Sequence, residues 1–319
     1  MKNLILLVLI VGGCGYFGAK FYLQYRVSSG LDDVLVMAAP FADIQYEGVS
    51  SNIAGVLSID GITIRMSEFR DPLYIDRLSI ITPGFFFLLN LAGIGQSGQD
   101  FDIPDSLGFA VDGVRASTSA DYIRKIYELG QQQVAASDAA DVAAVCAGKY
   151  GFAPATLKQL GYDEIVMSMR MAYRQNESNL FVEVSADVED MYEIGMTIKL
   201  ADRLTRETLL RGNYRPRIAE GRIEYLDLSL NQRSAKFCAR QGLSAQEILA
   251  AQVDAFAASG RENGVEFDDY VMEPYKEFLA GKSTFILTAK PSKPVSLSQI
   301  DLYKPSDVPA LLNLVGEVQ

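Results

Sequence analysis

The fold is decided by a stretch in the first third of the chain, Leu57-Ser58-Ile59-Asp60-Gly61-Ile62-Thr63-Ile64. In this stretch two apolar residues alternate with a polar one, an Asp and one variable residue follow, and two more apolar residues alternate again. The pattern recurs at residues 73–80 and 109–116, and at residues 295–302 with Ser in place of Asp. Since alternation with a period of two is typical of a strand with one buried face, each copy predicts a β-strand.

The Asp step changes the phase of this alternation. Strict alternation would place Ile62 and Ile64 on the opposite face of the sheet from Leu57 and Ile59. A β-bulge with one extra residue would let both halves bury the same face, while it bends and twists the strand. We therefore predict an α+β fold with a long, curved, mostly antiparallel sheet of bulged strands packed by several short helices. Each Asp is interpreted as a bulge or turn residue that accepts backbone N–H bonds, rather than as a catalytic group.

The amino-terminal residues form a long apolar run. Residues 4–19 carry no charge, and Lys20 is followed by an aromatic and basic flank at residues 21–26. As a helix with a rise of about 1.5 Å per residue, residues 3–23 would reach roughly 30 Å, which is enough to cross a bilayer core if Lys20 extends to the headgroups. We predict an uncleaved transmembrane helix within an anchor of residues 1–27.

Two other interpretations of this run stay open. A cleaved secretory signal has a short apolar core, but no small-x-small cleavage site precedes a clear polar start here. A lipoprotein signal is the other alternative, because Val11-Gly12-Gly13-Cys14 is close to a lipobox and would make Cys14 a lipidation site. In every case we expect the bulk of the chain to lie outside the cytoplasm. With the uncleaved anchor, we expect a single-pass inner-membrane protein with the bulk of the chain in the periplasm.

Composition argues against several classes of function. The net charge of −11 disfavours nucleic acid as a partner, because such contacts need clustered Lys and Arg. The chain has no His, so it lacks the commonest general base and the commonest zinc ligand, and no Trp that would stack on a sugar. The acidic clusters at 187–190 and 266–269 are interpreted as solvated loop charges. We expect no enzyme, metal or cofactor, and carboxylate-based hydrolysis is the remaining catalytic alternative.

Three cysteines are present, of which Cys14 lies in the predicted anchor. Cys146 and Cys238 are a possible disulfide in an oxidising compartment, or else two small buried thiols. A bond between them would close a loop of about 90 residues, for which chain entropy gives on the order of 4–5 kcal/mol.

The remainder of the chain divides into a β-rich part at residues 28–130 and an α+β part at 131–319 that continues the same sheet, unless 28–319 is one domain. The first part contains the apolar segment 83–94, which is too short to span a bilayer and is either buried against the sheet or dips into a membrane or groove. The GxGxxG spelling at 93–98 is interpreted as a loop, because no helix follows it. Residues 131–140 are the candidate hinge.

Helices and strands alternate through the second part. Helices are predicted by capping and spacing, and strands by alternation. We expect helices at residues 28–41, 118–130, 137–148, 154–161, after the capping box at Ser244, near Pro274 as a first-turn residue, and over Leu311, Leu312 and Leu314, and strands at 165–173, 180–188, 192–200, 222–230 and 284–289.

One predicted strand carries a methionine-rich face. Ile165, Met167, Met169, Met171 and Tyr173 alternate with other residues and share one side. Methionine fills irregular gaps in cores and also recurs on adaptable hydrophobic binding surfaces. Packing under a helix and ligand binding are therefore both open for this face.

The layout of one amino-terminal anchor followed by strands with the repeated Asp pattern resembles AsmA/TamB-like membrane-anchored bacterial envelope proteins. The resemblance covers the anchor and residues 42–116. It implies curved β-sheets with an apolar inner face and a role in lipid movement or outer-membrane assembly. Helices between the strands depart from that layout and count against a continuous lipid channel. No functional residue is carried over from the family.

From these observations we expect a periplasmic envelope protein, anchored in the inner membrane through residues 3–23, that binds or shields an apolar ligand such as lipid. The alternative is an envelope scaffold or assembly partner without a small ligand. An apolar groove would favour ligand binding and a solid core would favour the scaffold. The candidate apolar face consists of Ile62, Ile64, Phe86, Leu89, Met167, Met169 and Met171.

Overall fold

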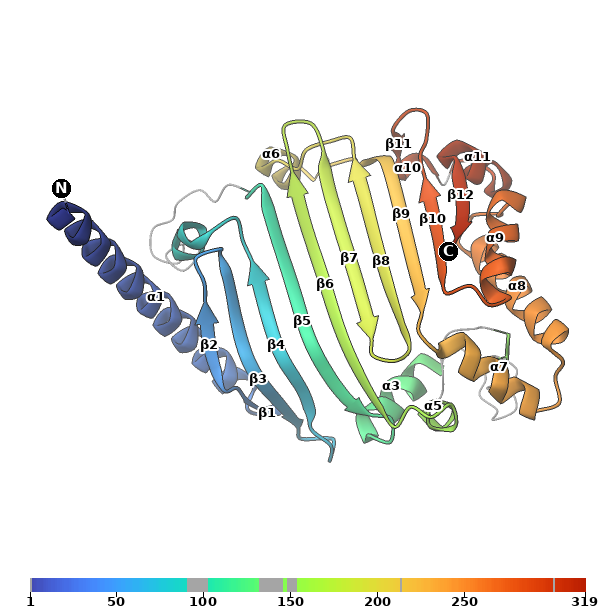
Figure 1. Cartoon of the computed structure of the whole chain (residues 1–319), viewed down its shortest axis with the longest axis horizontal. Coiled ribbons are helices and arrows are strands. Elements are labelled where there is room, and N and C mark those ends of the chain that lie inside the picture. The colour runs from blue at the N-terminus through green and yellow to red at the C-terminus, as the bar shows by residue number, and fades with distance from the viewer. Residues whose placement is uncertain (1, 91–102, 132–145, 148–153, 213, 301) are drawn as a thin grey trace. The chain divides into compact units, whose positions relative to one another are not determined.

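The computed structural model of the chain describes residues 2–90, 103–131, 146–147, 154–212, 214–300 and 302–319 (Figure 1). Contacts divide the chain into two compact units, residues 1–113 and 114–319, which are treated separately below. The division expected near residues 130 and 131 stays a prediction. The candidate hinge, the GxGxxG loop and the helix expected from Ser137 lie almost wholly outside the described residues.

The described residues of the first unit form one long helix, four strands, a short helix at residues 85–90 and the first part of a fifth strand. Its elements in chain order are α1 (Lys2–Ala38), β1 (Ala42–Gln45), β2 (Gly48–Ser51), β3 (Val56–Met66), β4 (Leu73–Ile81) and β5 (Ser106–Ser117).

The second unit carries most of the described helices. Its elements are α3 (Asp121–Gln131), α5 (Pro154–Gln159), β6 (Glu164–Gln175), β7 (Leu180–Val188), β8 (Tyr192–Leu200), α6 (Arg206–Leu210), β9 (Arg217–Asp227), α7 (Leu230–Arg240), α8 (Ala245–Glu262), α9 (Asp269–Leu279), β10 (Thr284–Ala289), β11 (Val295–Ser296), α10 (Leu297–Ile300), η1 (Pro305–Asp307), α11 (Val308–Leu312) and β12 (Leu314–Val318).

Within the described residues the strands form one open sheet of 12 strands in the order β1-β3-β4-β5-β6-β7-β8-β9-β10-β12, with β2 on β3 and β11 on β9. The described strand pairs are antiparallel. The α+β class and the mostly antiparallel sheet are thus confirmed.

Helix α1 runs without a break from Lys2 to Ala38. The separate helix expected from Ser28 is therefore wrong. Ser and Gly lower helix propensity by only about 1 kcal/mol each at most, and packing of the helix against the sheet offsets that cost. Leu23 is 1% exposed and packs with Leu57, Phe85 and Leu88, and the Gln24 amide donates to the Val49 carbonyl at 3.1 Å.

The amino-terminal segment expected as an anchor is thus joined directly to the folded unit. No helix within the described part of the chain combines the length and hydropathy that crossing a bilayer demands.

The Asp step differs from the expected bulge. Asp60 pairs with Arg77 and Ile62 pairs with Ile75, so the register of β3 and β4 is the same on both sides of Gly61. Strands β1 and β2 also keep one register with β3 across this level. The prediction of one extra residue per bulge is wrong for these pairs, because the interruption occurs at the same level in neighbouring strands. A register shift lies instead between β8 and β9, at Lys199/Leu200.

Glycine is required at this interruption. Gly61 has φ +62° and Gly113 has φ +63°, in the left-handed region that other residues rarely adopt. A Cβ on Gly61 would lie 2.3 Å from the Glu47 side chain, and one on Gly113 would lie within 2.2 Å of the Asp76 carboxylate. At these two copies the position after Asp therefore holds Gly where an acidic side chain lies against the backbone: Glu47, between β1 and β2, at Gly61, and Asp76 of β4 at Gly113.

The fourth copy of the pattern is not a strand throughout. Only Val295 and Ser296 are extended, and α10 follows at once. The partner strand β9 begins at Arg217, directly after Pro216, and the Leu297 N–H makes a last bond to the Pro216 carbonyl at 3.1 Å. Because the partner strand ends there, residues 297–302 have no continuing ladder, and this prediction is wrong.

Two predictions near the carboxyl terminus are also corrected. Pro274 lies in the interior of α9 rather than in its first turn. The terminal apolar segment forms α11, but Leu314 opens strand β12, which pairs with β10. Gly316 of β12 lies against α9, where an added Cβ would meet Pro274 and the Tyr270 carbonyl oxygen at 3.2 Å. Because Gly316 has no side chain, β12 can lie close to α9 at the helical turn that contains Pro274.

Candidate functional site

Apolar residues from four neighbouring strands lie in rows on one face of β6–β9. In one row Met171 pairs with Val184, Val184 with Met196, and Met196 with Ile223. In the next row Met169 connects through Ala186 to Ile194. Residues paired in register share a face of the sheet. We refer to the surface of Met169, Met171, Val184, Ile194, Met196 and Ile223 as the methionine face.

Large side chains of the methionine face are accessible to solvent. Met171 is 54% exposed, Met169 45%, Ile194 38% and Ile223 37%. The adjoining row, Met167, Val188 and Tyr192, is instead packed into a core that contains Leu157 from α5 and Phe237 from α7. The apolar rows therefore continue along the strands beyond the core that these helices cover.

The opposite side of the same strands is polar. Arg174 and Glu183 form an ion pair at 3.5 Å, and Arg222 and Glu224 form one at 2.9 Å. The Arg174 guanidinium also lies 4.5 Å from the centre of the Phe181 ring. Exposed ion pairs of this kind contribute little to stability, but they identify the hydrated side of the sheet. The methionine face is thus an apolar surface on a sheet whose other side is already adapted to water.

Sequence alternation predicted which methionines share a face, and β6 confirms that pattern. Met167 packs against the core, whereas Met169 and Met171 are exposed. One interpretation of the sequence was that a helix covers this whole face as part of the core. Met169 and Met171 are too exposed to fit that interpretation. Sequence analysis did not include Val184, Ile194, Met196 and Ile223 in the site, although alternation in residues 182–198 carries the signal.

The other candidate residues belong to the first unit. Ile62 is buried and Ile64 is half-buried in β3. Leu89 packs beside the core of Leu23 and Leu57, whereas Phe86 is 81% exposed. The seven candidate residues thus fall into two groups, and the methionines form theirs within the second unit.

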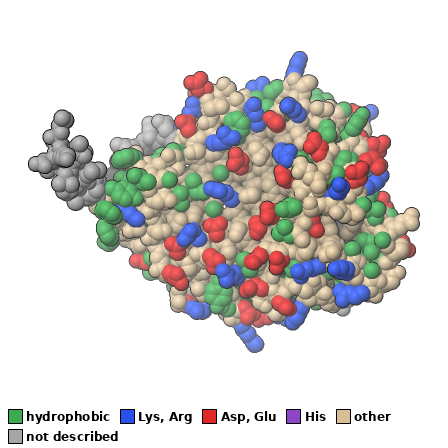
Figure 2. Space-filling view, in the orientation of Figure 1, with side chains coloured by type: hydrophobic (Ala, Val, Ile, Leu, Met, Phe, Trp, Pro, Cys, Tyr) green, Lys and Arg blue, Asp and Glu red, His purple; other side chains and the backbone are tan. Residues whose placement is uncertain are grey.

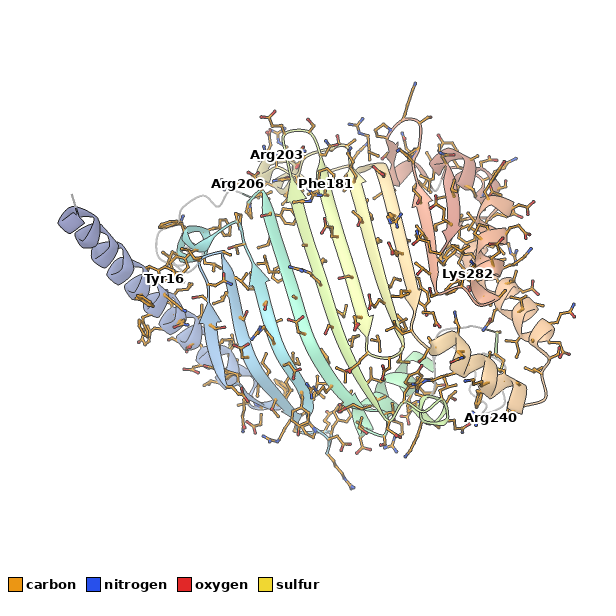
Figure 3. The ribbon with its side chains drawn as sticks, viewed as in Figure 1. Tyr16, Phe181, Arg203, Arg206, Arg240 and Lys282 are labelled. Carbon is orange, nitrogen blue, oxygen red and sulfur yellow. A yellow bond between two sulfur atoms is a disulfide. The ribbon has the colours of Figure 1, made fainter. Side chains whose placement is uncertain are left out.

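A second exposed apolar surface lies on α1. Phe17, Phe21 and Tyr25 recur every four residues and are 58%, 70% and 72% exposed. Tyr16, labelled in Figure 3, packs on Phe85 with ring centres 5.2 Å apart. In Figure 2, hydrophobic side chains gather next to the grey amino-terminal atoms. The aromatic flank predicted for a membrane anchor is therefore presented on the outside of a helix that is docked through Leu23.

Helices α7 and α8 and the turn between α9 and β10 line an open pocket of about 650 Å³ in the second unit. None of its lining residues belongs to the methionine face. Sequence analysis missed it, because residues 222–230 were expected to be one strand. The strand in fact ends at Asp227, whose carboxylate accepts the Asn231 N–H at 2.9 Å and opens α7. Burial raises the pKa of Asp227.

The acidic clusters have structural roles at some of their members. The Asp268 carboxylate accepts the Tyr270 N–H at 3.1 Å and caps α9. The Asp190 carbonyl accepts the Ser229 hydroxyl, next to the start of α7. Within the described part of the chain, no group of three or more Asp, Glu or Cys side chains is placed to hold a metal ion.

Cys146 and Cys238, the pair that the sequence left open, are joined by a disulfide with a Cα–Cα distance of 5.7 Å. The bond links residues 92 positions apart and is buried in the core beneath α7. The side chain of Cys14 lies outside the described part of the structure.

A family model described as "Uncharacterized protein" matches residues 181–317. The matched range contains β8, β9, the helices of the pocket and nearly all of β7, but not β6. No curated protein matches the chain.

Proposed function

We propose that this chain is a membrane-anchored periplasmic protein of the cell envelope that binds or shields an apolar ligand such as lipid on the methionine face. The observation that carries the proposal is the exposure of Met169 and Met171 in register with Ile194 and Ile223. Contiguous apolar surfaces on soluble domains mark interaction sites, because exposing them to water is costly. Flexible thioethers adapt to chains of irregular shape, as acyl chains are.

The arrangement of α1 supports the membrane part of the proposal. The uncharged run of residues 4–19 belongs to the same continuous helix that buries Leu23 in the first unit. We propose that residues 3–16 of this helix, about 20 Å long, insert into the bilayer, with Phe17, Phe21 and Tyr25 at the headgroup level; because Leu23 is buried in the folded unit, the span of residues 3–23 expected from the sequence is shortened. Aromatic residues are enriched at that depth. The anchor and the folded unit would then be one rigid element.

The disulfide supports the periplasmic part of the proposal. Stable structural disulfides form in oxidising compartments and are rare in the cytosol. Cys146 and Cys238 are 2% and 0% exposed, so their bond is protected from thiol exchange in the folded protein. An envelope location outside the cytoplasm accounts for this pair.

A scaffold without a small ligand is the second candidate function. It is favoured by one observation: the methionine face contributes no residue to the pocket of the second unit, and an exposed apolar surface outside a pocket also suits a protein partner. In that case the methionine face would be covered by a partner protein. Adaptable methionine surfaces also serve protein partners.

Native mass spectrometry with lipid extraction tests the proposal on full-length protein purified from membranes. The decisive variant is Met169→Glu with Met171→Glu, which adds charge to the methionine face. Its control is Ser185→Glu with Thr197→Glu on the polar side of β7 and β8. We expect phospholipid to stay with the wild type and the control and to be lost from the methionine variant.

The same experiment separates anchor lipid from bound lipid when it is repeated on a chain that begins at Tyr16. A chain that begins at Ser28 would lack Leu23 and is unsuitable. Lipid on the Tyr16 form would support ligand binding by the folded protein. Equal lipid on all variants would contradict the proposed face, and a stoichiometric protein partner released by the methionine variant would favour the scaffold.

A further inference from the structure

The pocket of about 650 Å³ in the second unit has the size of a small-ligand site. One wall is the side of α7 that carries Ala235 and Ala239. Another is the start of α8, with Ile248 and Leu249, and the third is the turn from α9 into β10, with Leu279. These residues give the pocket an apolar stretch beside its polar lining residues, and two of them are alanines that leave room for a ligand.

One of the polar lining residues is a buried amide. Gln252 of α8 is 9% exposed and lines the pocket. An amide both donates and accepts hydrogen bonds, so a polar group on a bound molecule can pair with Gln252. The pocket thus offers one directed polar contact on the α8 wall.

Two lysines line the pocket and give it positive charge. Lys236 lies on α7. Lys282, labelled in Figure 3, lies where the chain leaves α9 for β10. Neither ammonium forms an ion pair within the described part of the chain. Lys276, in contrast, is held by Glu273 at 2.6 Å. The lysines of the pocket are thus available to an anion.

Asp227 is the one carboxylate of the pocket lining, and its position separates it from Lys236. It accepts the N–H groups of Leu230 and Asn231 at the start of α7. Lys236 lies six residues further along α7 than Leu230, about 9 Å at the helical rise. The carboxylate is therefore engaged by the helix terminus and lies apart from Lys236. Lys282 is nearer to Asp227, because the Asp227 backbone N–H donates to the Ser283 carbonyl at 2.8 Å.

We propose that this pocket binds a single-chain amphiphile with a carboxylate headgroup, such as a fatty acid. The carboxylate lies between Lys236 and Lys282, and the chain extends between α7 and α8 past Ala239 and Leu249. Gln252 donates to a polar group of the ligand inside the pocket. A charged hydrogen bond from Lys to carboxylate is stronger than a neutral one, so the site selects the acid over an uncharged analogue. This site is separate from the methionine face and does not depend on the function proposed for it.

Fluorescence titration of the full-length protein in lipid nanodiscs, with empty nanodiscs as background, tests the proposal. The two ligands are dansyl-labelled undecanoic acid and the matching undecanamide. We expect the acid to bind and Ala239→Trp, which fills the pocket, to abolish binding. Lys236→Gln with Lys282→Gln should raise the Kd of the acid about tenfold or more and leave that of the amide unchanged. Lys293→Gln, in the loop before β11, is the matched control and should change neither.

Each other outcome overturns the proposal in a distinct way. Equal affinity for the acid and the amide would show that the pocket does not select a carboxylate. Unchanged binding in a folded Ala239→Trp protein would place the ligand elsewhere. Loss of binding in the Met169→Glu, Met171→Glu protein would assign the signal to the methionine face, and this result would leave the function proposed for that face standing. No binding of either ligand to the wild type would remove the site altogether.

Discussion

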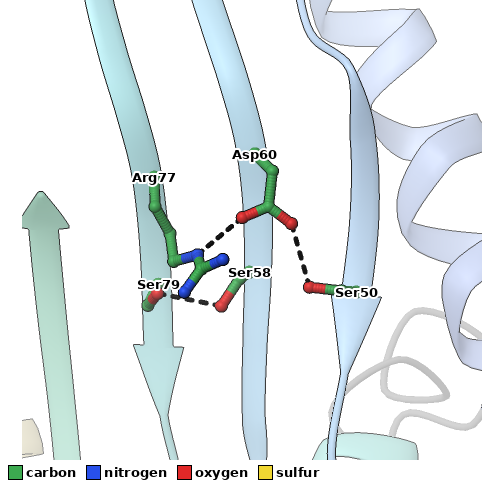
Figure 4. A network of polar contacts seen from close by, with 5 residues as sticks. All are labelled: Ser50, Ser58, Asp60, Arg77 and Ser79. Carbon is green, nitrogen blue, oxygen red and sulfur yellow. Dashed lines mark hydrogen bonds and ion pairs between the residues drawn. The ribbon is translucent and has the colours of Figure 1, made fainter. Parts of the chain in front are cut away.

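Asp60 and Arg77 lie opposite each other on β3 and β4, and the Arg77 Nε donates to the Asp60 carboxylate at 2.6 Å (Figure 4). The Ser50 hydroxyl of β2 donates to the other carboxylate oxygen at 3.1 Å. One level along the strands, the buried hydroxyls of Ser58 and Ser79 are 2.9 Å apart. In this copy of the repeated pattern, Asp60 thus connects three strands through side-chain bonds, rather than through the backbone N–H bonds that the sequence predicted.

Asp60→Ala should lower the thermal midpoint of the full-length protein slightly and leave lipid retention unchanged. The change removes the acceptor of two hydrogen bonds, but Arg77 is exposed and regains hydration. Asp43→Ala, which breaks an exposed pair with Arg65 at 3.5 Å, is the control for charge removal. Loss of lipid by Asp60→Ala at unchanged stability would show that the carboxylate acts in the function.

Leu23→Ala should destabilise the first unit by about 2–5 kcal/mol, because it leaves a cavity among Leu57, Phe85 and Leu88. Phe21→Ala, on the exposed side of the same helix, should change stability little. Denaturant unfolding of both variants measures the difference. Equal stability of the two would mean that α1 is not docked through Leu23, and the rigid anchor would then lose its support.

Asp227 and Asp202 should give opposite pH signatures. Burial raises the pKa of Asp227 above its unfolded value, so its contribution to stability is present at low pH and is lost as pH rises from about 4 through the raised value. Hydrogen bonding to Arg217 lowers the pKa of Asp202, so its contribution is present above about 4 and is lost as pH falls below that.

Thermal unfolding of Asp227→Asn and Asp202→Asn across pH 3 to 8 checks these signs, with pH steps of about one unit around the reference values. Asn still caps a helix, so Asp227→Asn should be at least as stable as the wild type at neutral pH. Asp202→Asn should be less stable there. Parallel pH curves for wild type and Asp227→Asn would contradict the burial of that carboxylate.

Cys146→Ser with Cys238→Ser should lower the free energy of unfolding by on the order of 4–5 kcal/mol, because the disulfide closes a long loop of the unfolded chain. Cys14→Ser is the control for loss of a thiol. Unfolding with and without reductant measures the same quantity on the wild type. A wild type that is equally stable under reducing conditions would argue against the oxidising compartment.

Several elements could be predicted because the signal is local. The capping box at Ser244 and Glu247 begins α8 as expected, and alternation in residues 165–173 gave the shared face of Met167, Met169 and Met171. Turn chemistry also predicted that Asp and Gly interrupt β3. The sequence did not predict that the register of β3 and β4 stays the same across Gly61, because the register depends on which residues of the neighbouring strands lie opposite Gly61.

The candidate sites depend on tertiary packing that local patterns do not carry. Exposure of Met171 depends on how far α5 and α7 reach along β6, and no local pattern encodes that distance. The pocket was not predicted because the alternation of apolar residues continues through Tyr225 toward Leu230 and indicates a strand. The Ser229 side chain also makes no capping hydrogen bond at the start of α7. The strand predicted at residues 295–302 was wrong because its partner strand β9 ends next to Pro216. That end is set by a segment about 80 residues away in the sequence.

Site-specific photocrosslinking in membranes tests the central claim most directly. A photoreactive amino acid replaces Met171 on the methionine face in the full-length protein, and the control replaces Ser185 on the polar side of β7. The account predicts phospholipid crosslinked at position 171 and none at position 185. Absence of any lipid crosslink at both positions, or a crosslink to a protein at position 171, would contradict lipid binding by the methionine face.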